Sequence, residues 1–207
     1  MSNRRSVLTR LLGLGGLGAL AKVGGAAEHP DEAFNGGLEL FFAQRDNVTA
    51  FNTSTGIGTQ IGTTEGVITG TSITNFQFTP TSQTTISFDN RCLITDTDGD
   101  SIIFDVKGTG QFLIPPPSDP NNSLGNLLAL GGPLVATYTA IIATGKYAFL
   151  IGQKYPAVFS AENAVGGSSG LLGTVYVEVY SNAVGIISSN IRKAKAASLA
   201  KLASRLG

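Results

Sequence analysis

Short runs in which every second residue is apolar are the feature that most constrains this fold. Between Leu38 and Tyr180 such runs are rich in Thr, Val, Ile and Phe and are separated by turn residues. This pattern is typical of short strands in an all-β sandwich or barrel. The strands that we expect are an alternation at Leu38, Leu40 and Phe42, a long strand at Val67–Thr79 bent at Gly70, and further strands at Thr85–Thr95, Ile102–Phe112, Val135–Ala143, Tyr147–Ile151 and Thr174–Tyr180.

The long, glycine-bent strands favour a closed antiparallel barrel over a sandwich, because closure demands curvature that glycine relieves. A barrel of about eight strands has an interior that side chains can fill or that can hold one small ligand. No strong helical period appears before residue 190. We therefore predict a β-barrel domain at residues 28–187 and a basic amphipathic helix at residues 188–207.

The formal net charge of zero conceals three differently charged segments. Residues 1–27 carry four basic groups and no acid, and residues 190–207 carry five basic groups and no acid. All 14 acidic residues lie in the body between them, beside only five basic ones, so the body has a net charge of −9. An acidic body of this kind makes nucleic acid an unexpected partner.

The first 27 residues predict an export signal. Arg4 and Arg5 open a basic region, Leu11–Val23 is an apolar run broken only by Lys22, and Gly25-Ala26-Ala27 is suited to cleavage. The run is shorter than the roughly 20 residues of a membrane-spanning helix. The arginine pair resembles a twin-arginine signal, which predicts a periplasmic or secreted protein. A mitochondrial presequence is the alternative.

The scarcity of histidine and cysteine excludes several kinds of site. His29 and Cys92 are the only residues of their types, so no internal disulfide, no multi-cysteine zinc site and no iron–sulfur site can form. We expect no metal site and no cofactor. Because Cys92 alternates with Phe88 and Ile94, we expect a buried small hydrophobe rather than a nucleophile.

Asp98-Gly99 predicts the tightest hairpin of the chain, because glycine accepts the positive φ that a two-residue turn requires. Asp96, Asp98 and Asp100 also resemble half of a calcium loop. The distal glutamate of such a loop is replaced by Lys107, so a turn is favoured over a calcium site.

Residues 115–133 interrupt the strand rhythm with a proline run followed by four leucines. Such a run cannot pair as a central strand. Two interpretations stay open: a crossover packed outside the barrel, and a lid over its mouth.

Several motifs resemble those of a family of small β-barrel proteins of unknown function. They are Gly62–Gly70 with its Glu-Gly pair, Asp89-Asn90-Arg91, Thr95 with Asp98-Gly99, Thr144–Leu150 and the closing strand Val175–Tyr180. The usual proline after the Glu-Gly pair is absent, and Phe149 stands at a tryptophan position. The resemblance implies a barrel and no particular reaction. In plan such barrels are similar to those of the allene oxide cyclase and dirigent type, which guide reactions of bound apolar substrates.

The polar strand residues supply candidate ligand-binding side chains. Asp89 and Arg91 share one strand face, and Glu178 lies opposite the face of Val175, Val177 and Val179. On an inward face, Arg91 could bind a carboxylate or enolate oxygen while Asp89 or Glu178 acts as a base. On an outward face, which is the default for charged residues, they would be solvated. The tyrosines Tyr138 and Tyr147 complete the candidate set.

Three functions follow as hypotheses. The favoured one is an exported barrel that binds a small, partly apolar molecule. The alternatives are an isomerase or cyclase and a structural or surface-interaction protein with a packed barrel. The basic helix either contacts a membrane surface or docks on its own acidic barrel, and docking is slightly favoured.

Overall fold

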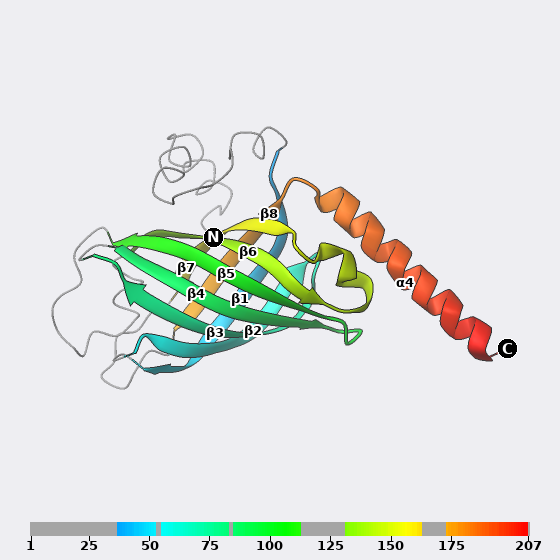
Figure 1. Ribbon diagram of the computed structural model, residues 1–207, viewed down its shortest axis with the longest axis horizontal. Helices are drawn as coiled ribbons and strands as arrows, with labels where there is room; N and C mark the ends of the chain where they lie inside the picture. The colour runs from blue at the N-terminus through cyan, green and yellow to red at the C-terminus, as the bar shows by residue number, and fades with distance from the viewer. Residues whose placement is uncertain (1–36, 53–54, 83–84, 113–130, 163–172, 207) are drawn as a thin grey trace. The chain divides into compact units, whose positions relative to one another are not determined.

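The computed structural model describes residues 37–52, 55–82, 85–112, 131–162 and 173–206, and the fold belongs to the unit Glu39–Gly207. Eight antiparallel strands follow one another around a closed barrel, and β1 pairs with β8 to close it (Figure 1). This confirms the predicted barrel. The strands are β1 Glu39–Asn52, β2 Ile57–Gly66, β3 Gly70–Pro80, β4 Thr85–Asp96, β5 Ser101–Phe112, β6 Gly131–Ala143, β7 Lys154–Glu162 and β8 Thr174–Ser181.

One predicted strand is wrong, another begins three residues later than predicted, and two strands, β2 and β7, were not expected. The strand predicted from Val67 begins only at Gly70, because residues 67–69 form the turn that joins β2 to β3. Thr69 Oγ1 donates to the carbonyl of Gly66 in this turn, and Ile68 is fully buried. The apolar run therefore closes one end of the barrel instead of extending the strand.

The segment predicted as a strand at Tyr147–Ile151 is instead the 3₁₀ helix η1, Gly145–Leu150. Side chains at positions i and i+3 of such a helix lie on the same face. Tyr147 and Leu150 have this spacing, and both are buried. Tyr147 and Leu150 thus pack inward from one face of this short helix.

The expected alternation at the start of β1 also differs. A register shift between Leu40 and Phe42 against β8 shows a β-bulge. A bulge adds one residue to a strand, which changes the face that the following side chains occupy. Leu40 is therefore 46% exposed, whereas Phe41 and Phe42 are both fully buried.

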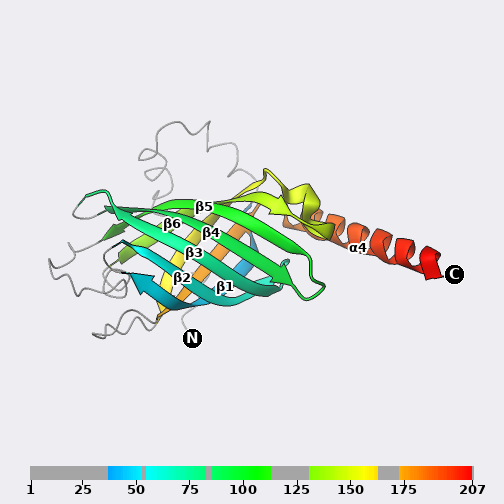
Figure 2. The same ribbon diagram turned by 60° about the horizontal axis from the view of Figure 1, so that its bottom comes forward.

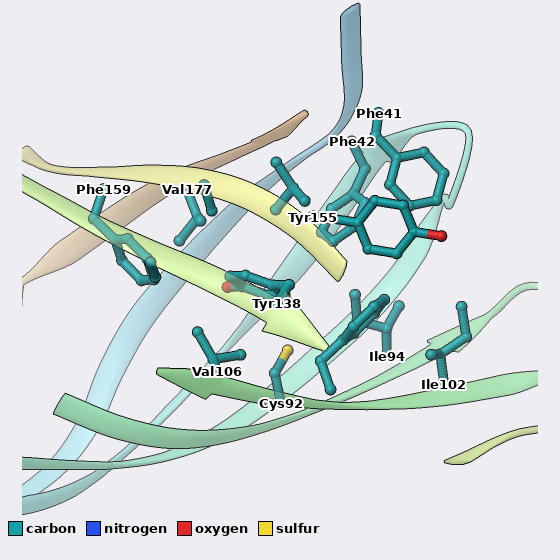
Figure 3. Close-up of a cluster of buried hydrophobic side chains, with 14 of the residues drawn as sticks. Phe41, Phe42, Cys92, Ile94, Ile102, Val106, Tyr138, Tyr155, Phe159 and Val177 are labelled. Atoms are coloured by element: carbon teal, nitrogen blue, oxygen red, sulfur yellow. The ribbon is translucent and has the colours of Figure 1, made fainter. Parts of the chain in front are cut away.

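The core lies inside the barrel. Along β8, Val175, Val177 and Val179 point inward and are buried, and Cys92 of β4 is fully buried, as predicted. Aromatic side chains from several strands meet in the interior (Figure 3). Phe104 and Tyr138 have ring centroids 5.4 Å apart, and Phe41 and Tyr155 have centroids 4.8 Å apart. The interior is thus filled by side chains along much of its length.

A long helix, α4 (Val184–Leu206), follows β8 and begins earlier than the predicted boundary at residue 188. It contacts η1 and β1 at the end of the barrel where β8 finishes (Figures 1 and 2). Ile187 is buried there, and Ile191 packs against the core cluster. Among the described residues, no helix has the length and apolar character needed to cross a membrane.

The predicted export signal at residues 1–27 lies outside the described residues. So do residues 115–130 of the proline-rich segment, and with them both interpretations of that segment. Its last residues, 131–133, belong to β6.

Candidate functional site

Polar side chains enter the barrel interior on one side of its wall. Strands β1–β4 supply most of the buried polar residues of the described chain, whereas the inward positions of β5–β8 are almost all apolar. The buried polar residues of β1–β4 are Gln44, Asp46, Gln60, Thr64, Ser72, Thr74, Asn90 and Asp96. The wall formed by β1–β4, which we call the polar wall, mixes these residues with apolar ones such as Phe42 and Phe88, and it faces a wall that is almost entirely apolar.

Asp46 is at the centre of this polar wall and is completely buried. Its carboxylate accepts hydrogen bonds from Gln44 Nε2 at 2.5 Å, Gln60 Nε2 at 2.8 Å and Ser72 Oγ at 2.6 Å, with Thr74 Oγ1 at 3.5 Å. We call these five residues the Asp46 cluster. Every donor in the cluster is a neutral side chain, and no cation of the described chain is ion-paired with Asp46.

Burial raises the pKa of Asp46 above its ordinary value, because a desolvated carboxylate loses the hydration of its charge. The hydrogen bonds from Ser72, Gln44, Gln60 and Thr74 lower the pKa in turn but do not cancel the effect of burial. A buried carboxyl group with a raised pKa can donate or accept a proton closer to neutral pH than an exposed one.

Gln44 connects the Asp46 cluster to the opposite wall. Its amide oxygen accepts a hydrogen bond from Tyr138 Oη of β6 at 3.2 Å, and its amide lies 3.7 Å from Cys92 Sγ of β4. Because β1, β4 and β6 are not neighbours, these contacts cross the interior. Figure 3 shows Cys92 Sγ directed toward Tyr138. Burial raises the pKa of Cys92 to about 12, so its thiol stays protonated at neutral pH.

An aromatic pocket lies beside the Asp46 cluster, toward the barrel end opposite η1. Its apolar lining comes from β3, β4, β6, β7 and β8, and Gln60 and Asn90 are its two polar residues. Of the lining side chains only that of Phe78 is half-buried, and the rest are buried. The free volume is about 10 Å³, close to the space of one water molecule. The apolar lining consists of Phe76, Phe78, Phe88, Leu134, Phe159 and Val175.

The ring of Phe88 lies close against strand β5, and this close approach depends on Gly108. Phe88 is paired across the strands with Gly108 of β5. A Cβ atom at Gly108 would lie 2.3 Å from Cζ of Phe88 and 2.3 Å from the carbonyl oxygen of Val135. The missing side chain therefore lets the phenyl ring lie across the neighbouring strand.

Asn90 is the polar residue of the pocket with an unused hydrogen-bonding group. Its side chain is buried, and its Oδ1 atom has no hydrogen-bond partner among the described residues. A buried acceptor without a partner costs about 1–3 kcal/mol, so such an atom usually meets a water molecule or a ligand. The pocket thus offers one acceptor within an apolar, aromatic surface.

The structure separates the candidate residues that the sequence put forward. Asp89 and Arg91 lie on the outer face of β4, where Arg91 pairs with Asp105 at 3.5 Å and Asp89 with Lys107 at 3.5 Å. Their side chains are 62% and 59% exposed, respectively. The outward alternative is therefore the one that the structure has, because the inward face of β4 is occupied by Phe88, Asn90 and Cys92.

Of the other candidates, only Tyr138 points into the interior. Tyr147 is buried in η1 at the far end of the barrel, where its hydroxyl bonds to Asp96. Glu178 lies on the outer face of β8, half-buried, and accepts a hydrogen bond from Tyr180 Oη at 2.7 Å. The five candidates therefore do not form one site.

The three aspartates of the β4–β5 hairpin meet lysines. Lys146 of η1 is buried and pairs with Asp96 at 2.5 Å and with Asp98, and Lys195 of α4 reaches Asp98 at 2.8 Å. The backbone N–H of Lys146 donates to Asp100 Oδ2 at 3.2 Å. We call these five residues the lysine clamp. Within the described residues, no group of His, Cys, Asp and Glu has the arrangement of a metal site.

The hairpin lies where Asp98-Gly99 predicted it, but its turn is longer than the two residues expected. The N–H of Asp96 donates to the carbonyl of Asp100, and that of Gly99 to the carbonyl of Asp96, so residues 97–99 lie between the bonded pair. Gly99 has a φ of 88°, a conformation that favours glycine. Asp96 Oδ1 accepts hydrogen bonds from the backbone N–H groups of Asp98 and Asp100 at 2.8 and 3.0 Å. The hydrogen bonds from Lys146 and Lys195 hold the pKa of Asp98 at about 2.

Sequence reasoning missed the polar residues of the Asp46 cluster. Gln44 and Asp46 alternate with the apolar residues Phe42 and Val48, so one face of β1 carries both kinds of side chain. Two polar residues between two apolar residues on the same strand face could have indicated that the polar pair is buried as well. Gln60 carried no comparable signal, because its strand was not expected at all.

No protein-family model matches the sequence, and no curated protein matches it. The solved structures that match it include the following two. A protein of unknown function from Clostridium acetobutylicum is 14% identical, with 69% of this chain and 96% of that one covered and a TM-score of 0.41. A β-barrel-like protein from Acinetobacter baumannii is 20% identical, with 69% and 93% covered and a TM-score of 0.42. The chain is an eight-stranded β-barrel, and its resemblance to a family stays a prediction.

Proposed function

We propose that the barrel binds a small, partly apolar molecule in the aromatic pocket, with Asn90 Oδ1 accepting a hydrogen bond from it. The observation that carries this proposal is the unpartnered, buried acceptor inside a pocket lined by four phenylalanines. Small-molecule sites are mostly apolar and contain a few polar groups that orient the ligand. The matching ligand is a compact, flat molecule that carries a hydroxyl or N–H donor.

The small free volume restricts how such a ligand enters. At about 10 Å³ the pocket holds no ring unless a side chain moves. Phe78 is the half-buried ring of the lining, so its displacement exposes the least additional core. We therefore expect binding to shift Phe78 and to leave Phe76 and Phe88 in place.

Saturation-transfer NMR with phenol and toluene tests this proposal. The two probes are similar in size and differ in the hydroxyl donor, so binding through Asn90 predicts a signal for phenol that exceeds that for toluene. Phe78→Ala should strengthen the binding of both probes because it enlarges the pocket. Asn90→Leu should remove the preference for phenol, because an apolar side chain replaces the acceptor.

Arg91→Ala is the matched control on the same strand. Its side chain is on the outer face, so phenol binding should not change. The proposal fails if the wild-type protein gives no signal with either probe. It also fails if phenol and toluene bind equally well, because a single water molecule on Asn90 would then account for the pocket.

An acid–base enzyme of the isomerase or cyclase kind is the second candidate function. The observation that favours it is Asp46, a buried carboxyl group of raised pKa that is hydrogen-bonded to Gln60 of the pocket. Asp46 does not itself line the pocket, so on this hypothesis Gln60 moves aside and lets the carboxyl group exchange a proton with the bound molecule directly. Asp46→Asn would then abolish turnover while phenol binding persists.

We also propose that the protein is exported by the twin-arginine route. The support is the sequence of residues 1–27, with its arginine pair, short apolar run and small residues before Glu28. Replacing both Arg4 and Arg5 with lysine should retain the precursor inside a bacterial host that carries this route. Equal export of the variant would refute the proposal.

A further inference from the structure

The described part of helix α4 has five basic residues, all from Arg192 onward, and no acidic residue. Its cations are Arg192, Lys193, Lys195, Lys201 and Arg205. Lys195 is paired with Asp98, and no ion pair is formed by the other four within the described residues. Every residue from Ala196 to Arg205 is exposed. The helix therefore presents four cations to its surroundings.

Only the first half of α4 is attached to the barrel. Ile187 and Ile191 pack against the core, and Lys195 follows one turn later with its ion pair to the hairpin. Leu199 and Leu202 come next on the same side of the helix, because residues three and four apart are neighbours on a helix surface. They are 58% and 55% exposed, so the apolar stripe continues where the barrel no longer covers it.

Exposed apolar side chains also gather at the barrel end from which α4 starts. Strand β1 begins there, β6 ends there, and η1 follows β6 and contacts α4 (Figure 2). Each of these elements and the first turn of α4 exposes at least one large apolar residue. These residues are Leu40, Ile142, Phe149, Ile151 and Ile186.

We propose that α4 and this end of the barrel form a docking surface for an anionic lipid bilayer. The four free cations match the negative charge of the lipid headgroups, and each basic residue near an anionic surface strengthens binding about fivefold. Leu199, Leu202 and the exposed apolar residues of the barrel end would enter the interface, as apolar side chains of peripheral proteins do. The charge complementarity and the apolar residues at the same end favour a bilayer over a soluble polyanion.

Vesicle co-sedimentation with the full chain tests this proposal. We expect the protein to bind vesicles of phosphatidylglycerol mixed with phosphatidylcholine, to bind less at high salt, and to bind pure phosphatidylcholine vesicles poorly. Replacing Arg192, Lys193, Lys201 and Arg205 with glutamine should reduce binding by at least a hundredfold. Lys195 is retained in this variant so that α4 keeps its ion pair to Asp98.

Two further variants make the test specific to this surface. Replacing Arg91 and Lys107, two exposed cations of the barrel wall, with glutamine should leave vesicle binding unchanged. Both residues lie outside the proposed docking surface and are already ion-paired. Replacing the exposed residues Phe149 and Ile186 with serine should weaken binding even at low salt. Circular dichroism checks that each variant is folded.

Three results would overturn the proposal. The first is equal vesicle binding by the four-cation variant, which would attribute binding to another segment, such as the basic residues 1–27. The second is binding to heparin or duplex DNA without binding to vesicles. The third is that the wild-type protein binds no vesicles while the four-cation variant differs from it in oligomeric state, as measured by analytical ultracentrifugation.

Discussion

Lys146→Met should lower the free energy of unfolding much more than the replacement of an exposed lysine does. Methionine is similar in length and apolar, so the change removes the ammonium group of the lysine clamp and retains most of the packing. The side chain of Lys146 is 9% exposed, and that of its partner Asp96 is 2% exposed. The substitution therefore leaves a buried carboxylate without a cation.

The magnitude follows from the burial of this pair. Removing one partner of a buried ion pair costs about 3–5 kcal/mol. We expect a loss of about 3 kcal/mol in the free energy of unfolding, at the lower end, because Tyr147 and the backbone N–H groups of Asp98 and Asp100 still hold Asp96. Lys107→Met is the matched control, since Lys107 also pairs with two aspartates but is 65% exposed. Its cost should be about 0–1 kcal/mol.

The pH dependence gives an independent check. Burial opposes the ionisation of Asp96, but hydrogen bonds from Lys146, Tyr147 and the N–H of Asp98 outweigh it and lower its pKa below 3.8. The pKa of Asp98 is lowered to about 2. A carboxyl group whose pKa is lower in the folded state stabilises the fold above its unfolded pKa and loses that effect as the pH falls. The clamp should therefore act fully at neutral pH and weaken between pH 3.8 and about 2.

Urea unfolding of both variants and the wild type, followed by circular dichroism at neutral and at acid pH, measures these differences. The loss caused by Lys146→Met should shrink as the pH falls below 3.8. Adding Asp96→Asn should recover part of the loss at neutral pH, because no buried charge is left. A cost equal to that of Lys107→Met, or one independent of pH, would refute the reasoning.

Three further predictions concern the barrel interior. Cys92 should not react with a thiol reagent at pH 8 in the native state and should react fully in denaturant, since burial raises its pKa to about 12; rapid reaction of the native protein would contradict the buried position. Carboxyl ¹³C NMR should show that the pKa of Asp46 is above its ordinary value of 3.8. Ionising Asp46 should therefore lower the free energy of unfolding as the pH rises from 3.8 through the pKa of the folded state. A pKa at or below 3.8 would mean that its hydrogen bonds outweigh burial. Gly108→Ala should lower the free energy of unfolding by about 1–3 kcal/mol, because the added methyl group overlaps Phe88 and the carbonyl of Val135, whereas Gly185→Ala in α4, which meets nothing within 4 Å, should leave it unchanged or raise it; equal effects of the two substitutions would argue against the close approach.

The fold could be predicted further than the site. Strands β4, β5 and β8 match their predicted ranges to within one residue, because their alternation is regular and turn residues limit it. The strand start predicted at Val67 and the strand predicted at Tyr147–Ile151 are wrong, because apolar residues at a barrel end pack inward from turns and a 3₁₀ helix as well as from strands. Local periodicity does not distinguish these two ways of burying an apolar side chain.

The candidate site was harder, because alternation shows two faces of a strand without showing which one is enclosed. Asp89 and Arg91 on β4 and Gln44 and Asp46 on β1 are all polar residues in alternating strands. Only the first pair was considered, and it faces outward. The sequence could not predict that the Oδ1 atom of Asn90 has no hydrogen-bond partner, since this depends on which side chains the neighbouring strands place beside it.

The sequence alone thus determined that the chain forms many short strands and that the charge is divided among three segments, and it favoured a barrel over a sandwich. These properties follow from residues that are close along the chain, through period-two burial, turn chemistry and composition. Only the tertiary structure decided which residues meet. Tyr138 and Gln44 are 94 positions apart and hydrogen-bond across the barrel, and Lys146 reaches a hairpin 48 positions away. Closure of the sheet creates these contacts, so no local pattern contains them.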